Sequence, residues 1–177
     1  MTSLDTHLQS VAASASSQAP AVAFFDLDRT LIAGYSILAL AMETAQNGAR
    51  RGQWRQSAKV ARDLLKHKVD GSGSNYHRVV RRTSRALTGI SEDALSRLGA
   101  QAYRKHLAKS LYREAITLVE THRAAGHKLV IVSAASRYQI EPIASVLGIE
   151  EICCTRLEVV DGRFTGQVIA PLCYGEG

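Results

Sequence analysis

The sequence predicts an α/β protein, with a Rossmann-like parallel sheet core that is incomplete and an inserted all-helical cap. Two observations predict this fold. A short apolar strand pattern near the N-terminus is separated from the next one by a long stretch of helical periodicity, and strand and helix patterns alternate after that stretch. A chain of 177 residues, 46% of them hydrophobic, is long enough for one core and a smaller inserted unit.

Changes in composition predict the boundaries. Residues 1–20 are rich in Ser, Ala and Gln, so we expect a flexible N-terminal tail with a short helix near Leu4–Val11. We expect residues 21–33 and 112–177 to form the α/β core and residues 34–111 to form the helical cap.

The first strand pattern is the apolar run Ala21–Phe25, and two carboxylates follow it, Asp26 and Asp28. Side chains alternate along a strand, so both aspartates would share a face if the strand continued. Paired carboxylates at the end of a buried strand are costly unless they bind a cation or serve anion chemistry. The structural alternative is a helix cap beside a surface charge.

The predicted cap is basic. Between Gly34 and Ser110 there are 15 Lys and Arg residues against 5 Asp and Glu residues, whereas the formal charge of the chain is +6. The first cap helix, which begins after Tyr35, is expected to end near Asn47–Gly48. A basic stripe at helical spacing follows it: Arg51, Arg55, Lys59, Arg62 and Lys66. Such a stripe is either a solvated helix face or a surface that attracts phosphate groups or an anionic membrane.

Two later helices have recognisable ends. Ser91 is expected to cap a helix, because its hydroxyl can accept from free amides and the acidic residues that follow favour the positive helix end. Another helix is expected from about Arg113 to Gly126.

After the cap, strands and helices alternate. The apolar run Lys128–Ser133 predicts a buried parallel strand. Ser136 and Gln139 have the spacing of a capping box, although Pro142 would fit better as the first residue of the next helix. That helix is expected to end at Leu147–Gly148.

The last part of the chain reads as strands. Glu151–Thr155 is expected to be a third core strand, and Asp161–Gly162 between two further strand patterns predicts a β-hairpin. We expect Cys153 and Cys154 to be small buried hydrophobes. Three cysteines without metal or CxxC spacing suit a reducing cytoplasm.

The sequence Asp26-Leu27-Asp28-Arg29-Thr30 after an apolar strand resembles the first motif, Asp-x-Asp-x-Thr, of the haloacid dehalogenase-like phosphatases. Ser133 at the end of a later strand, and the helical insertion between the two, strengthen this resemblance. Further segments are similar to the phosphoserine phosphatase-like branch, subfamily IB: Leu147–Ile149, Thr155–Val159 with Asp161–Gly166, and Pro171–Gly177.

This resemblance implies a phosphatase that uses Mg²⁺, bound by the carboxylate of Asp26 and the backbone carbonyl of Asp28. Asp26 would form an aspartyl-phosphate, and Asp28 would protonate the leaving alcohol and later deprotonate the hydrolytic water. Thr30 would hold the loop and Asp28 by hydrogen bonding. Ser133 would bind a phosphoryl oxygen, helped by loop amides such as that of Ala134.

The chain also departs from the family. The resemblance implies a lysine and an acidic motif that complete the charge balance and the Mg²⁺ shell, and both would lie beyond Gly177. We therefore expect a C-terminally truncated chain with little or no turnover. Phosphoserine phosphatases have a glutamate soon after the aspartate motif that recognises the substrate amine. Here Gly34–Ile37 has no acid and the next one is Glu43, so we expect another small phosphomonoester as substrate.

Alternatives to the enzyme stay open. One is a non-catalytic or regulatory module of a larger protein, since similar sequences are sometimes fused to a glycerophospholipid acyltransferase. Another is a basic domain that contacts an anionic membrane. Nucleic-acid binding is disfavoured, because few aromatic residues, Trp54 and Tyr76, lie among the arginines for stacking. We expect a cytoplasmic location, with membrane association through a partner domain.

Overall fold

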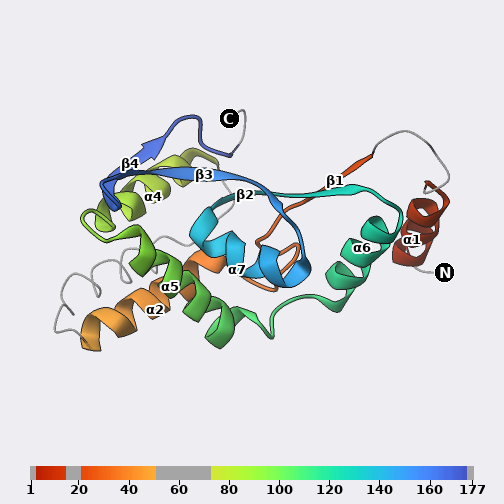
Figure 1. The fold of residues 1–177 in the computed structure, drawn as a ribbon, viewed down its shortest axis with the longest axis horizontal. Coiled ribbons are helices and arrows are strands. Elements are labelled where there is room, and N and C mark those ends of the chain that lie inside the picture. The colour runs from red at the N-terminus through yellow and green to blue at the C-terminus, as the bar shows by residue number, and fades with distance from the viewer. Residues whose placement is uncertain (1–2, 15–20, 51–72, 175–177) are drawn as a thin grey trace.

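The computed structural model describes residues 3–14, 21–50 and 73–174, which form one sheet and the helices around it (Figure 1). The helical elements are α1 (Ser3–Ser14), α2 (Ser36–Arg50), α4 (Gly73–Ala86), α5 (Glu92–Ala102), the π-helical turn η1 (Tyr103–Leu107), α6 (Arg113–Ala124) and α7 (Arg137–Leu147). The strands are β1 (Val22–Phe25), β2 (Lys128–Ser136), β3 (Glu151–Val160) and β4 (Arg163–Ile169).

The sheet has the order β1-β2-β3-β4. The first three strands are parallel, and β4 pairs antiparallel with β3. The predicted α/β class and the parallel arrangement of the three core strands are therefore confirmed. The segment Glu151–Thr155 does not end before the hairpin, because β3 continues to Val160 as one long strand.

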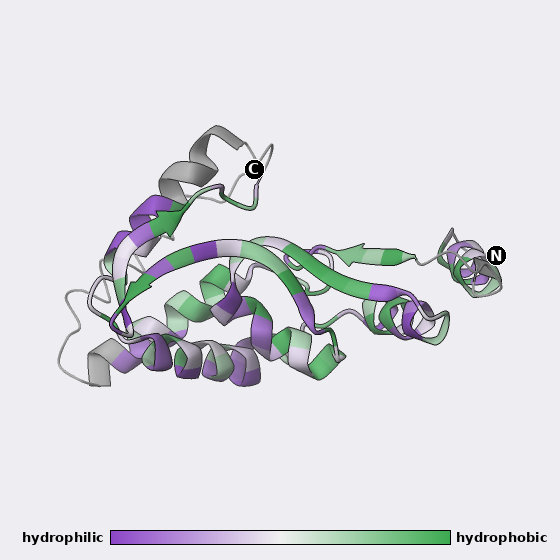
Figure 2. Ribbon diagram, turned by 45° about the horizontal axis from the view of Figure 1, so that its top comes forward, coloured by the Kyte–Doolittle hydropathy of each residue, from purple (hydrophilic) through white to green (hydrophobic). Residues whose placement is uncertain are grey.

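The larger core lies between the sheet and the helices α6 and α7, which Figures 1 and 2 show on one side of it. Along β1 the side chains alternate, so that Ala23 and Phe25 are buried whereas Phe24 is 68% exposed. Figure 2 shows β1 and much of β2 in the green of apolar residues. Burial of this face fixes the register that carries the chain to Asp26 at the end of β1.

A second, smaller core joins the helices of the cap to α7 and β4. Its buried members are Leu40, Leu95, Tyr138 and Phe164. The rings of Tyr138 and Phe164 meet edge to face with centroids 5.2 Å apart. The Tyr138 hydroxyl donates to a carboxylate oxygen of Glu92 at 2.8 Å. The cap is thus held on the core by apolar burial and by polar contacts, of which this is one.

The predicted hairpin turn and the helix start at Ser91 agree with the structure, whereas the helix start at Pro142 does not. Asp161 and Gly162 both have positive φ, 49° and 70°, which a type I′ hairpin turn requires. Ser91 caps α5 by accepting from the Ala94 amide. The capping box of Ser136 and Gln139 starts α7, so the alternative start at Pro142 is wrong and this proline lies inside the helix.

The predicted end of the first cap helix at Asn47–Gly48 is wrong, because α2 continues to Arg50. The Asn47 side chain donates to the Glu43 carbonyl at 2.9 Å and to Gln101 at 3.3 Å, and these bonds hold it on the helix. The basic stripe predicted from Arg51 to Lys66 lies outside the described residues.

The two adjacent cysteines are not both buried, which corrects the expectation for Cys153. Side chains alternate along β3, so Cys153 is exposed whereas Cys154 packs partly against the core. The Sγ atom of Cys153 lies 3.8 Å from that of Cys173.

At the N-terminus, the helix expected near Leu4–Val11 is α1, which spans Ser3–Ser14 and packs on α6. Val11 is buried in that contact region. The boundaries between tail, core and cap stay predictions. Of the helices in the described ranges, none has the length and hydropathy that a bilayer span needs.

The helices α5 and α7 pack closely at Gly99, which leaves no room for a side chain. A Cβ atom at this position would overlap the carbonyl oxygen of Tyr138. We expect Gly99→Ala to lower the free energy of unfolding by about 3 kcal/mol, since backbone must move to make room. Ser96→Ala, on the exposed side of α5, is the control and should change it by less than about 0.5 kcal/mol. Urea denaturation measures both, and equal stability of the two variants would contradict the close helix contact.

Candidate active site

The candidate site lies at the carboxyl edge of the parallel strands. Phe25, the last residue of β1, pairs with Ile131 of β2, so Asp26 and Ser133 follow at the same edge of neighbouring strands. The Asp26 side chain is exposed, and Ser133 is 4% exposed. The structure thus brings both predicted residues to one edge, where ligands bind in open α/β sheets.

The loop after Asp26 is tightly turned. The Leu27 side chain is fully buried, and its carbonyl accepts from the amides of Thr30, Leu31 and Ile32 at 3.0–3.3 Å. Arg29 has a φ of 65°, in the left-handed region, and its amide donates to the Gly34 carbonyl. This turn returns the chain over the strand end and starts α2 directly beside Asp28.

Asp28 is half-buried at the N-terminus of α2. The Ser36 amide donates to its Oδ1 at 2.8 Å, so the carboxylate lies where free helix amides favour negative charge. Burial raises the pKa of the Asp28 carboxyl above its ordinary value of 3.8, the hydrogen bonds from Ser36 oppose the rise, and the Asp26 charge adds to it. A carboxyl with a raised pKa is suited to transferring protons.

Thr30 binds a different aspartate from the one expected. Its hydroxyl donates to Oδ2 of Asp26 at 2.9 Å, whereas the sequence predicts a bond to Asp28. The expectation for Asp28 is wrong because Ser36, eight residues further on, supplies its amide to that carboxylate. Thr30 therefore orients the Asp26 carboxylate through Oδ2, and the other carboxylate oxygen, Oδ1, takes no part in this bond.

Ser133 lies immediately before an irregularity in β2. Ser133 pairs with Cys154 and Ser136 with Thr155, so two residues of β2, Ala134 and Ala135, bulge out of the ladder. The Ser133 hydroxyl oxygen accepts from the Ala135 amide at 3.2 Å. The bulge turns the chain at the strand end, which is where Ser133 and Ala134 are predicted to bind substrate.

Two buried polar residues behind Asp28 are not recognisable as site residues from motif spacing alone. Gln139 donates from Nε2 to the Ser36 hydroxyl oxygen at 3.0 Å, although 103 residues separate them. Ser36 is 1% exposed and Gln139 is 7% exposed. The only signal for Gln139 in the sequence is its capping-box spacing from Ser136, in the helix that follows Ser133. A capping box predicts the bond to Ser136, but it does not predict the second bond to Ser36.

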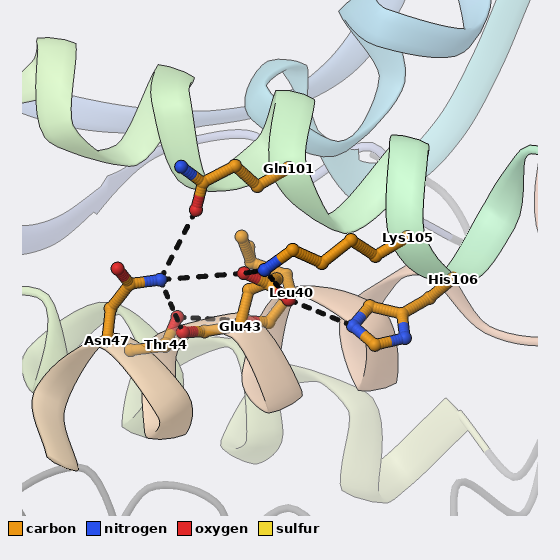
Figure 3. Close-up of polar contacts among 7 residues, drawn as sticks. All are labelled: Leu40, Glu43, Thr44, Asn47, Gln101, Lys105 and His106. Carbon is orange, nitrogen blue, oxygen red and sulfur yellow. Dashed lines mark hydrogen bonds and ion pairs between the residues drawn. The ribbon is translucent and has the colours of Figure 1, made fainter. Parts of the chain in front are cut away.

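Glu43 lies fully buried in the cap, between α2 and η1 (Figure 3). Lys105 donates to both carboxylate oxygens at 3.0 and 2.9 Å, and the His106 Nε2 atom lies 3.0 Å from Oε1. Burial raises the pKa of Glu43, but the hydrogen bonds and charges of Lys105 and His106 outweigh it and hold the pKa below its ordinary value of 4.5. Its carboxylate is therefore engaged inside the cap, where it fastens α2 to η1.

The site's donors can be tested against Mg²⁺, which prefers oxygen ligands in an octahedron. The exposed carboxylate of Asp26 and the nearby Asp28 are ligands of the right kind. Across the described ranges no cluster of three or more His, Cys, Asp and Glu side chains is arranged to hold a metal ion. These donors therefore fit Mg²⁺ but supply only part of its shell.

Comparisons with known proteins agree on the type of protein. Residues 23–177 match the family described as haloacid dehalogenase-like hydrolase. A probable phosphatase of Mycobacterium tuberculosis is 32% identical over 165 residues, which cover 90% of this chain and 55% of that protein. The chain spans about half the length of the first curated relatives it matches.

Solved structures share the fold. A protein of unknown function from Bordetella pertussis Tohama I superposes with a TM-score of 0.71 at 26% identity, covering 88% of this chain and 69% of that one. A phosphoserine phosphatase solved as an analogue of its phospho-aspartyl intermediate gives a TM-score of 0.52 at 20% identity, covering 85% of this chain and 63% of that one.

The Glu43 cluster predicts a pH-dependent contribution to stability. Because the pKa of folded Glu43 is lowered, its ionised form stabilises the fold above about pH 4.5, and this contribution is lost as the pH falls through the lowered pKa. We expect Glu43→Gln to cost about 1–2 kcal/mol at neutral pH, with the difference from wild type shrinking in acid. Urea denaturation across this pH range measures it.

Glu141→Gln is the matched control, since Glu141 pairs with Arg137 at the surface. Its cost should be below about 0.5 kcal/mol at every pH. If Glu43→Gln were equally harmless at neutral pH, the buried cluster would not hold α2 in place.

Proposed function

Because this chain belongs to the haloacid dehalogenase-like hydrolase family, we propose that it is a phosphomonoester hydrolase domain that acts through an aspartyl-phosphate on Asp26. The observation that carries the proposal is the pair of aspartates after β1. Asp26 is exposed and oriented by Thr30, while Asp28, two residues on, is half-buried and has a raised pKa. One carboxylate is placed to attack and the other to transfer protons.

In the first half of the proposed reaction, Asp26 attacks phosphorus and the bond from phosphorus to the substrate's alcohol oxygen breaks. Thr30 holds Oδ2 of Asp26, which leaves Oδ1 as the attacking atom. Asp28 gives its proton to the departing alkoxide, so the product leaves as a neutral alcohol. The raised pKa of Asp28 supports this role, since the carboxyl must be protonated at the start.

In the second half, Asp28 takes a proton from water, and the water oxygen attacks phosphorus to release inorganic phosphate and regenerate Asp26. Ser133 and Ala134 are proposed to bind phosphoryl oxygens, which their position at the bulged end of β2 supports. Mg²⁺, held by Asp26 and Asp28 when bound, would offset the negative charge between carboxylate and phosphate. Within the part of the chain that the structure describes, Asp26 and Asp28 supply only part of an Mg²⁺ shell, and we expect these residues alone to turn over weakly.

We propose a small phosphomonoester other than phosphoserine as the substrate. Recognition of an amino group near the site would need an acidic side chain facing the substrate. The first acid after the aspartate motif, Glu43, is fully buried and bonded to Lys105 and His106. The phosphoserine phosphatases among the similar proteins support the phosphomonoester class and the fold, and the choice of substrate rests on the chain's own residues.

A non-catalytic or regulatory role in a larger protein is the alternative. The loop that holds Asp26 and Asp28 is intact in its hydrogen bonds, which favours the enzyme. Fusion to a glycerophospholipid acyltransferase, contact with an anionic membrane and a cytoplasmic location stay predictions from the sequence.

The decisive variants are Asp26→Asn and Asp28→Asn in the full-length protein, assayed with Mg²⁺ on an aryl phosphate and on phosphoserine. We expect Asp26→Asn to lower kcat by at least about 10³-fold, since it removes the nucleophile. Asp28→Asn should lower it by about 10²–10⁴-fold, the usual contribution of a proton-transferring group. Ser96→Ala serves as an unrelated surface control on α5. Wild-type activity no higher than that of Asp26→Asn would favour the non-catalytic alternative.

A further inference from the structure

A chain of buried hydrogen bonds runs from the core helix α7 to Asp28. Gln139 accepts at Oε1 from the Ser136 amide at 3.0 Å and from the Ser136 hydroxyl at 2.8 Å. Its Nε2 atom donates to the Ser36 hydroxyl oxygen at 3.0 Å. The Ser36 amide donates to the Asp28 carboxylate at 2.8 Å, and the Ser36 hydroxyl beside it lowers the pKa of Asp28 as a second hydrogen-bonding group. The chain thus begins three residues after Ser133 and ends on the second aspartate.

The direction of each bond in this chain is fixed by chemistry. A backbone amide can only donate, so the Ser136 amide requires the oxygen of the Gln139 carboxamide to face it. The nitrogen of that carboxamide then faces Ser36 and can only donate. Because a serine hydroxyl oxygen accepts through a lone pair, the Ser36 hydroxyl that accepts from Gln139 keeps its one hydrogen available for Asp28.

The same series of hydrogen bonds connects the α/β core to the helical cap. Gln139 lies on α7, which packs on the sheet, and Ser36 is the first residue of α2, the first helix after the aspartate loop. Both side chains are buried, so water does not readily replace either partner. A displacement of α2 would therefore break bonds on which the orientation of Asp28 depends.

We propose that Gln139 and Ser36 are positioning residues for Asp28. Gln139 orients the Ser36 hydroxyl, and Ser36 holds the Asp28 carboxylate with its hydroxyl and its amide. This assignment rests on the proposed function, since it gives Asp28 the role of proton donor and acceptor. The proposal means that the aspartate motif alone does not orient Asp28. The orientation of its carboxylate also depends on Ser36 and Gln139, which lie 8 and 111 positions further along the sequence.

Gln139→Glu separates positioning from helix capping. A glutamate serves a capping box as well as a glutamine does, so the bonds from Ser136 and the start of α7 are kept. The new side chain has no N–H group, so the donor to Ser36 is lost and the Ser36 hydrogen turns toward an added acceptor. We expect kcat of the full-length protein to fall by about 10–100-fold, with KM changed by less than about threefold.

Ser36→Ala provides the second variant, because it removes the hydroxyl and keeps the backbone amide that binds Asp28. Its kcat should also fall about tenfold or more. The double variant should be no slower than the slower single variant, since both changes interrupt one chain. Glu141→Gln, on the exposed side of α7, is the matched control and should leave kcat within about twofold.

Hydrogen exchange at the residue-36 amide gives a readout that needs no turnover. We expect exchange to accelerate at least about tenfold in Gln139→Glu, while the amide of Leu95 in the second core stays within about twofold. Single variants with wild-type kcat, independent effects in the double variant, or unchanged exchange at residue 36 would overturn the proposal. If wild type were no faster than Asp26→Asn, the proposed function would fail, and the exchange rates would still decide whether Gln139 holds Ser36.

Discussion

One hydrogen bond, from the Ser36 amide to the Asp28 carboxylate, is the contact on which the arrangement of this molecule depends. The chain leaves the sheet after β1, turns back within the loop that follows Asp26, and must then begin a helix next to a half-buried charge. The amide at the start of α2 stabilises that charge, and the charge in turn stabilises the helix start. The loop that carries Asp26 and Asp28 and the first cap helix are therefore positioned by the same interaction.

The remainder of the cap reinforces this position. Two turns after Ser36, Glu43 is fully buried and fastens α2 to η1 through Lys105 and His106 (Figure 3). At the other end, Gln139 ties Ser36 to the helix that follows Ser133. A carboxylate that is proposed to transfer protons must keep a fixed direction toward the leaving oxygen, and contacts on both sides of α2 supply that restraint.

Much of the fold follows from the sequence because its signals are local. The strand before Asp26, the Asp161–Gly162 turn and the helix cap at Ser91 each depend on neighbouring residues, and the structure has them all. One error involves a contact between distant residues, since Asn47 bonds Gln101, 54 residues further on. Asn47 ends a helix by propensity, but its bonds to Glu43 and Gln101 keep it helical.

In the candidate site, too, some features could be predicted from local sequence and others could not. The motif places Asp26 and Asp28 correctly at the strand end, whereas the partner of Thr30 and the 103-residue link from Gln139 to Ser36 depend on how the loop and the helices pack. The proposed function requires that Asp26 carries the phosphoryl group during turnover. Acid quenching during turnover, followed by mass spectrometry of the peptides, tests it most directly. We expect an acid-stable, hydroxylamine-labile phosphoryl group on Asp26. A phosphoryl group on another residue, or turnover without any phosphorylated residue, would show that Asp26 is not the nucleophile.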